Sequence, residues 1–95
     1  GVFNDRGATL AGVRVVDDLF PGVVMIATGA WYDPEHPGCP GSLEKHGNPN
    51  VLTLDKGASR LAQSIAAQTV LVEIELHEGP LPEITAFDRP PIAEE

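Results

Sequence analysis

The residues best suited to recognising a ligand lie in one run, His46-Gly47-Asn48-Pro49-Asn50-Val51-Leu52-Thr53-Leu54-Asp55. Asn48 and Asn50 each carry a carboxamide, which donates and accepts hydrogen bonds and so matches the edge of a heterocycle. Pro49 fixes its own φ and favours an extended backbone at Asn48, so the two carboxamides are held in place. The same residues also fit a surface Asx turn that leads into a strand, and this alternative stays open.

A second polar run, Gly57-Ala58-Ser59-Arg60-Leu61-Ala62-Gln63, follows a few residues later. Ser59 adds a hydroxyl, Gln63 adds a carboxamide, and Arg60 adds a guanidinium whose fork matches phosphate oxygens. The two runs predict a polar cradle for a ligand.

Motifs for catalysis are missing from the chain. It has no HExxH, CxxC or GxSxG sequence, no phosphate-binding glycine loop and no plausible Ser/His/Asp set. His36, His46 and His77 lack the spacing of metal ligands, and Cys39 has no basic neighbour that would make it reactive. Most carboxylates fall in turns or in the tail, where we interpret them as solvated. We therefore predict binding, with no catalytic residue and no metal ligand in this chain.

Composition limits the partners and the size of the core. The 95 residues, 42% of them hydrophobic, fit one small domain with a modest core. Six basic and fourteen acidic residues give a net charge of −8, which argues against a nucleic acid or an anionic membrane surface as the main partner. No apolar run approaches the roughly 20 residues of a membrane span. The single cysteine excludes an internal disulfide, so the fold needs no oxidising compartment.

Ten glycines and nine prolines predict many turns and few long helices. The turn residues at 4–7 predict a β-hairpin between residues 2–3 and a strand over residues 9–16. Residues 23–27 are a short apolar run typical of a buried strand, and prolines and glycines predict a long irregular loop over residues 33–42.

The second half of the chain continues this pattern. A short helix capped by Ser59 is expected over residues 59–67. The clearest strand covers residues 69–75, with Val70, Val72 and Ile74 as its inner row, and residues 84–87 form a last edge strand.

Several short strands separated by turns indicate a mainly β fold, a small barrel or sandwich, over residues 1–87. Residues 88–95 are acidic and proline-rich, which predicts a disordered tail. Because Val2 and Phe3 look like the end of a strand, we expect a piece of a longer protein.

Several motifs resemble one family in the right order along the chain, and we list them here: Asn4-Asp5-Arg6-Gly7, Pro21-Gly22-Val23-Val24, Gly29-Ala30-Trp31-Tyr32-Asp33-Pro34, His46-Gly47-Asn48-Pro49-Asn50-Val51-Leu52-Thr53, Ser59-Arg60-Leu61-Ala62-Gln63 and Gln68-Thr69. They resemble the C-terminal domain of the dimethyl-sulfoxide reductase family of molybdopterin oxidoreductases. Within that family the likeness is greatest to biotin sulfoxide reductase and its trimethylamine N-oxide and dimethyl sulfoxide reductase relatives.

The resemblance implies a six-stranded double-psi β-barrel, here without its first strands, that covers a bis(molybdopterin guanine dinucleotide) cofactor with molybdenum. It implies that Asn48, Pro49 and Asn50 contact the pterin and pyrophosphate parts, and that a second group does so as well: Ser59, Arg60, Gln63 and Gln68. The molybdenum ligand would come from another domain, so the chain alone is not expected to be catalytic. Its partners would be the other domains of the parent enzyme and an S-oxide or N-oxide substrate, and alone it would self-associate.

Two other hypotheses are a stand-alone binding or assembly module with the same barrel, and a small hydrolase or decarboxylase with a related one. The first needs its own start and stop signals around this segment. The second needs an activated serine, but Ser42, Ser59 and Ser64 have no base beside them in the sequence.

Overall fold

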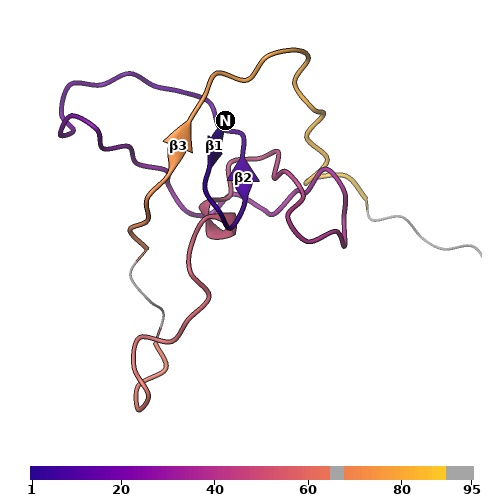
Figure 1. Cartoon of the computed structure of the whole chain (residues 1–95). Coiled ribbons are helices and arrows are strands. Elements are labelled where there is room, and N and C mark those ends of the chain that lie inside the picture. The colour runs from indigo at the N-terminus through magenta and orange to yellow at the C-terminus, as the bar shows by residue number, and fades with distance from the viewer. Residues whose placement is uncertain (65–67, 90–95) are drawn as a thin grey trace, which may run out of the picture.

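The computed structural model describes residues 1–64 and 68–89, and these residues form a mainly β structure with almost no helix (Figure 1). A three-stranded antiparallel sheet has the order β2-β1-β3. Its strands are β1 (Val2–Phe3), β2 (Ala8–Thr9) and β3 (Glu73–Ile74), and the 3-10 helix η1 spans Pro49–Val51.

The predicted hairpin at the N-terminus is confirmed. Val2 pairs with Thr9, and the Asn4 amide donates to the Gly7 carbonyl at 3.0 Å to close the loop. The Asn4 side-chain oxygen also accepts from the Arg6 and Gly7 amides at 2.9 and 3.3 Å, which is the Asx-turn chemistry that favours a turn at this position.

Beyond β2, the sheet is extended by single residues. Glu44 bridges Thr9 in parallel and Pro34 in antiparallel fashion, and its amide donates to the Ala8 carbonyl at 3.0 Å. On the other side β3 pairs with β1, with Val2 opposite Ile74. The backbone ribbon therefore runs from Pro34 through Glu44, β2 and β1 to β3.

The irregular loop that the sequence predicts over residues 33–42 is present, and it extends to Glu44. The Glu35 amide donates to the Leu43 carbonyl at 2.7 Å, and turns at 36–39 and 39–42 shape the tip, where Cys39 is exposed. The loop brings its two ends, Pro34 and Glu44, beside each other.

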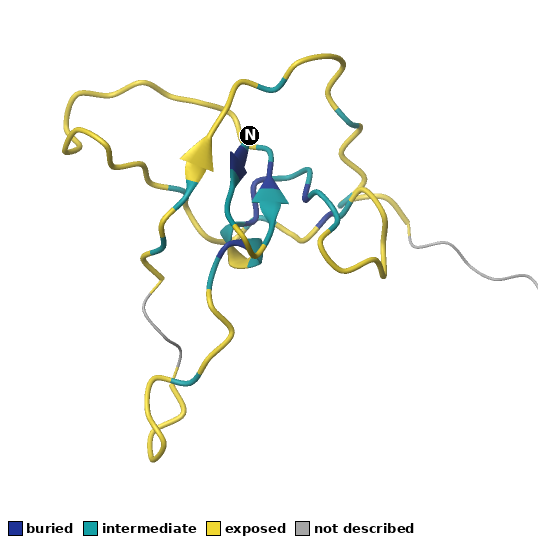
Figure 2. Cartoon of the chain, in the orientation of Figure 1, coloured by how far each residue is buried: buried dark blue, intermediate teal, exposed yellow. Residues whose placement is uncertain are grey.

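The centre of the molecule is unusually polar. Val2 and Leu52 are its buried hydrophobic residues among those described, and the buried polar residues are Thr9, Asp33, Glu44 and Asn48. Figure 2 shows this small buried centre surrounded by exposed chain. We call residues 11–28 the first arm and residues 54–64 the second arm. Both are largely exposed, and Val15 in the first arm is 91% exposed.

Several predicted elements are shorter than expected or missing. The strand predicted over residues 9–16 ends at Thr9, the strand predicted over residues 69–75 covers only Glu73–Ile74, and residues 23–27 and 84–87 form no strand. A strand needs a paired neighbour, and within the described part of the chain the remaining residues of these stretches lie in no ladder.

The remaining expectations concern closure, the helix and the tail. The described sheet does not close into a barrel. Residues 59–64 contain no helix, and residues 65–67 of the predicted helix lie outside the described residues. Residues 90–95 of the predicted tail lie outside them as well.

Candidate functional site

Pro49 and two side-chain hydrogen bonds hold the Asn48-Pro49-Asn50 turn in one conformation. Asn48 is extended, with φ −79° and ψ 112°, as expected before proline, and its side-chain oxygen accepts from the Asn50 amide at 2.9 Å. This hydrogen bond forms the Asx turn of the alternative interpretation and caps η1, but the turn leads into this 3-10 helix and not into a strand. Thr53 Oγ1 closes the far side by donating to the Asn50 carbonyl at 3.1 Å.

The two carboxamides of this turn have different surroundings. Asn48 is 9% exposed, and its Nδ2 donates to the Ala30 carbonyl at 3.0 Å. The Asn48 side chain is therefore used on both its donor and its acceptor side to hold the chain. Asn50 is exposed, so its carboxamide faces outward from a backbone that is fixed on both sides.

Glu44 lies beneath the turn and is fully buried, at 0% exposure. Its Oε2 accepts from Thr9 Oγ1 at 2.6 Å and from the Asn48 amide at 2.7 Å. Its Oε1 accepts from the amides of His46 at 2.9 Å and Asp33 at 3.2 Å. One carboxylate thus joins β2, the long loop and the turn.

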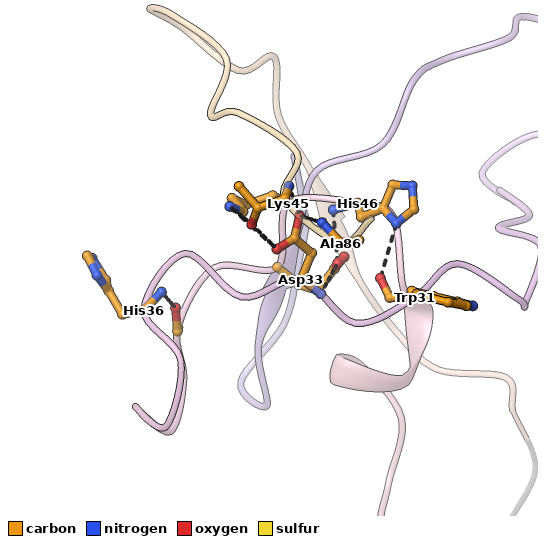
Figure 3. Close-up of polar contacts among 9 residues, drawn as sticks. Trp31, Asp33, His36, Lys45, His46 and Ala86 are labelled. Carbon is orange, nitrogen blue, oxygen red and sulfur yellow. Dashed lines mark hydrogen bonds and ion pairs between the residues drawn. The ribbon is translucent and has the colours of Figure 1, made fainter. Parts of the chain in front are cut away.

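Asp33 forms a second buried cluster, with the C-terminal segment (Figure 3). Its carboxylate accepts from the Thr85 amide at 2.6 Å, from the Thr85 hydroxyl at 2.8 Å and from the Ala86 amide at 3.0 Å. Lys45 Nζ lies 3.5 Å from the same carboxylate. Burial acts to raise the pKa of Asp33, but the Thr85 hydrogen bonds and the Lys45 charge lower it more, so the pKa lies below its ordinary value.

Three aromatic rings gather beside these clusters. The rings of Trp31 and Phe87 lie 5.7 Å apart at 38°, and the His46 ring meets Phe87 edge-on at 5.3 Å. Figure 3 also shows His46 Nδ1 directed at the Trp31 carbonyl, 3.1 Å away. Trp31 therefore anchors the loop to the C-terminal segment, while remaining 64% exposed.

The hairpin loop packs on the end of η1. Asn4 Nδ2 donates to the Leu52 carbonyl at 2.9 Å, and Arg6 Nη1 reaches the same oxygen at 3.3 Å. A Cβ built on Gly7 would lie 2.7 Å from the Val51 carbonyl oxygen, so only glycine fits this approach.

The second polar run does not join the first in this structure. Its hydrogen bonds are local: Ser59 exchanges bonds with the backbone of Ala62, and Gln63 Nε2 donates to the Ser59 carbonyl at 2.8 Å. Arg60 and Gln68 are exposed. Figure 1 shows the second arm projecting away from the sheet and from η1.

Sequence reasoning missed Glu44 and Asp33, because acidic residues in a loop were interpreted as solvated. That interpretation is wrong for both, since each is buried and bonded. Within residues 1–64 and 68–89 no three potential metal ligands cluster, and no helix is long and apolar enough to cross a membrane.

The sequence that forms the Asn48 turn lies within a region that matches known proteins. The family model for the molydopterin dinucleotide binding domain matches residues 1–71. The chain therefore belongs to this family of cofactor-binding domains, and the resemblance to the dimethyl-sulfoxide reductases is confirmed. No solved structure matches the chain.

Its relatives are oxide reductases. Trimethylamine-N-oxide reductase of Salmonella typhi is 56% identical over 89 residues, which is 94% of this chain and 10% of that protein. Trimethylamine-N-oxide reductase 1 of Escherichia coli K12 is 56% identical over 84 residues, 88% of this chain and 10% of that protein. Dimethyl sulfoxide/trimethylamine N-oxide reductase of Rhodobacter capsulatus is 48% identical over 93 residues, 98% of this chain and 11% of that protein. The chain thus spans about a tenth of the length of these relatives.

Proposed function

We propose that this chain is the domain of a molybdenum N-oxide or S-oxide reductase that binds and covers the bis(molybdopterin guanine dinucleotide) cofactor. The observation that carries the proposal is the family match over residues 1–71, which includes the whole Asn48 turn. The relatives named above reduce trimethylamine N-oxide or dimethyl sulfoxide, as their names state, and this supports the same substrate class for the parent enzyme.

The residues present fit such a cofactor. Asn50 offers an exposed carboxamide on a fixed backbone, which suits the alternating donors and acceptors of a pterin edge. Arg60 offers an exposed guanidinium suited to the phosphate oxygens. When bound, the cofactor supplies the redox chemistry, and the protein binds and orients it.

The predicted contact residues then divide into two roles. Asn48 and Pro49 hold the turn, and Asn50 contacts the pterin. Ser59, Arg60 and Gln63 of the second arm, together with Gln68, complete the cradle when they are held against the cofactor.

The fold follows the same proposal. Residues 1–87 form one domain, and its open sheet becomes a double-psi barrel together with strands from the rest of the parent enzyme. The exposed apolar side chains of the first arm support this, because large exposed apolar surfaces mark contact sites. Without the parent, the chain self-associates through the same surfaces.

The test compares Asn50→Ala with Asp88→Ala in the full-length enzyme, because both side chains are exposed. Asn50→Ala removes a hydrogen-bonding group that faces the cofactor, which costs about 1–3 kcal/mol where the partner is left unsatisfied. We expect lower molybdenum and pterin content for Asn50→Ala and unchanged content for Asp88→Ala. Equal content in the two purified variants would count against the placement.

A further inference from the structure

We infer that Glu44 is the positioning residue of the cofactor-binding turn, because its buried carboxylate sets the place from which Asn50 is presented. This inference rests on the proposed function. It concerns a residue that lies beneath the turn and would itself touch no part of the cofactor.

All four groups that donate hydrogen bonds to the Glu44 carboxylate are neutral. Each of its oxygens accepts two hydrogen bonds, at distances from 2.6 to 3.2 Å. Three of the four donors are backbone amides, which cannot turn away from the carboxylate without moving the chain. Hydrogen bonds to a carboxylate are shorter and stronger than those between neutral groups. The carboxylate therefore fixes backbone positions rather than side-chain rotamers.

Only two hydrogen bonds separate Glu44 from the residue that faces outward. Glu44 Oε2 accepts from the Asn48 amide at 2.7 Å, and the Asn48 side-chain oxygen accepts from the Asn50 amide at 2.9 Å. The other bonds tie the same carboxylate to Thr9 in β2 and to Asp33 in the long loop. Glu44 thus fixes the position of the turn relative to the sheet.

The substitution Glu44→Gln tests this arrangement with little change of size. If the NH2 group replaces Oε1, it faces the Asp33 and His46 amides; if it replaces Oε2, it faces the Asn48 amide, while the Thr9 hydroxyl can turn and accept from it. Glu35→Gln is the matched control, because Glu35 lies in the same loop with an exposed side chain.

The experiment uses the full-length enzyme and measures two properties. The first is amide hydrogen exchange at His46 and Asn48, the second is pterin content after acid release. For Glu44→Gln we expect exchange to accelerate by about tenfold or more at whichever of these two amides faces the new NH2 group, because that amide loses a buried hydrogen bond. Pterin content should fall, and Glu35→Gln should change neither property.

A double-mutant cycle separates positioning from general stability. If Glu44 acts through the turn, adding Asn50→Ala to Glu44→Gln lowers pterin content less than Asn50→Ala does alone. A merely structural Glu44 predicts additive losses, together with equal acceleration of exchange in β1 and β2. Additive losses with this uniform acceleration would overturn the inference, as would unchanged exchange at His46 and Asn48.

Failure of the proposed function has a different signature. If Asn50→Ala alone leaves pterin content unchanged, the cofactor placement is wrong, and with it the inference that the turn serves the cofactor. If Glu44→Gln does not fold, Thr9→Val replaces it. This substitution keeps the carboxylate but removes the hydroxyl that ties its Oε2, the acceptor of the Asn48 amide, to β2. Exchange at Asn48 should then accelerate by a smaller factor, and no acceleration would contradict the inference.

Discussion

The region around Glu44 and the two arms use their side chains in opposite ways. We call residues 1–10, 30–35 and 43–53 the bonded centre. There, buried Thr9, Asp33 and Glu44 are tied by side-chain hydrogen bonds between segments far apart in the sequence. In the first arm, by contrast, Val13, Val15 and Phe20 are each more than 80% exposed.

This difference shows which part of the chain needs no contacts with other surfaces. Every buried side-chain nitrogen and oxygen among the described residues has a hydrogen-bond partner, so the bonded centre needs nothing more to satisfy its polar groups. The arms carry apolar side chains without a surface to cover them within the described chain. The bonded centre therefore presents the turn, and the arms are suited to contacts with other surfaces.

The largest effect expected from this contrast is self-association of the isolated chain. Exposed apolar side chains on the first arm and the open sheet edge favour contact between copies. Light scattering at micromolar concentration should give a mass above the 10.1 kDa of one chain. Changing Val13 and Val15 to lysine should lower that mass, whereas Arg14→Ala between them should not.

A monomer mass for the unaltered chain, together with protected amides in residues 9–16, would break the comparison. It would mean that the first arm folds onto its own chain and is as self-sufficient as the bonded centre.

A smaller effect is expected from two glycines, one in each region. Gly7→Ala places a Cβ 2.7 Å from the Val51 carbonyl oxygen, whereas nothing lies within 4 Å of a Cβ at Gly12 in the first arm. Overpacking of this kind costs about 1–3 kcal/mol. In the full-length enzyme, amide exchange at Leu52 should accelerate for Gly7→Ala and stay unchanged for Gly12→Ala. Equal exchange in the two variants would show that the hairpin loop does not pack on η1.

Features with a local cause could be predicted from the sequence. The hairpin turn follows from the side chain of Asn4, which bonds amides two and three residues away. The extended backbone at Asn48 follows from Pro49 beside it. The mainly β class follows from many short apolar runs between turns. Family membership follows from the order of several such local motifs.

Features with distant causes could not be predicted. The burial of Glu44 depends on Thr9, 35 positions away, and the hydrogen bonds of Asp33 depend on Thr85, 52 positions away. The predicted strand lengths were wrong for the same reason. Propensity marks a run as strand-like, but a ladder needs a neighbour at the right register. Residues 9–16 have the composition of a strand, yet the structure pairs only the first of them.

The smallest effect concerns pH, because the contact between Asp33 and the C-terminal segment is lost only in acid well below neutrality. The pKa of Asp33 in the folded chain lies below its ordinary value of 3.8, so its carboxylate stabilises the contact with Thr85 and Ala86 at any pH above that value. As the pH falls through the lowered pKa, the carboxyl takes up a proton and this stabilisation is lost.

Release of this segment separates Phe87 from Trp31, which is the only tryptophan of the chain. Tryptophan fluorescence of the isolated chain, followed from about pH 6 to about pH 2, should therefore change only near the acid end. Asp33→Asn should show the acid-like signal already at the upper end, since its NH2 group faces donors, while the exposed control Asp88→Asn should follow the unaltered chain. An acid transition that persists in Asp33→Asn would assign the contact to other groups.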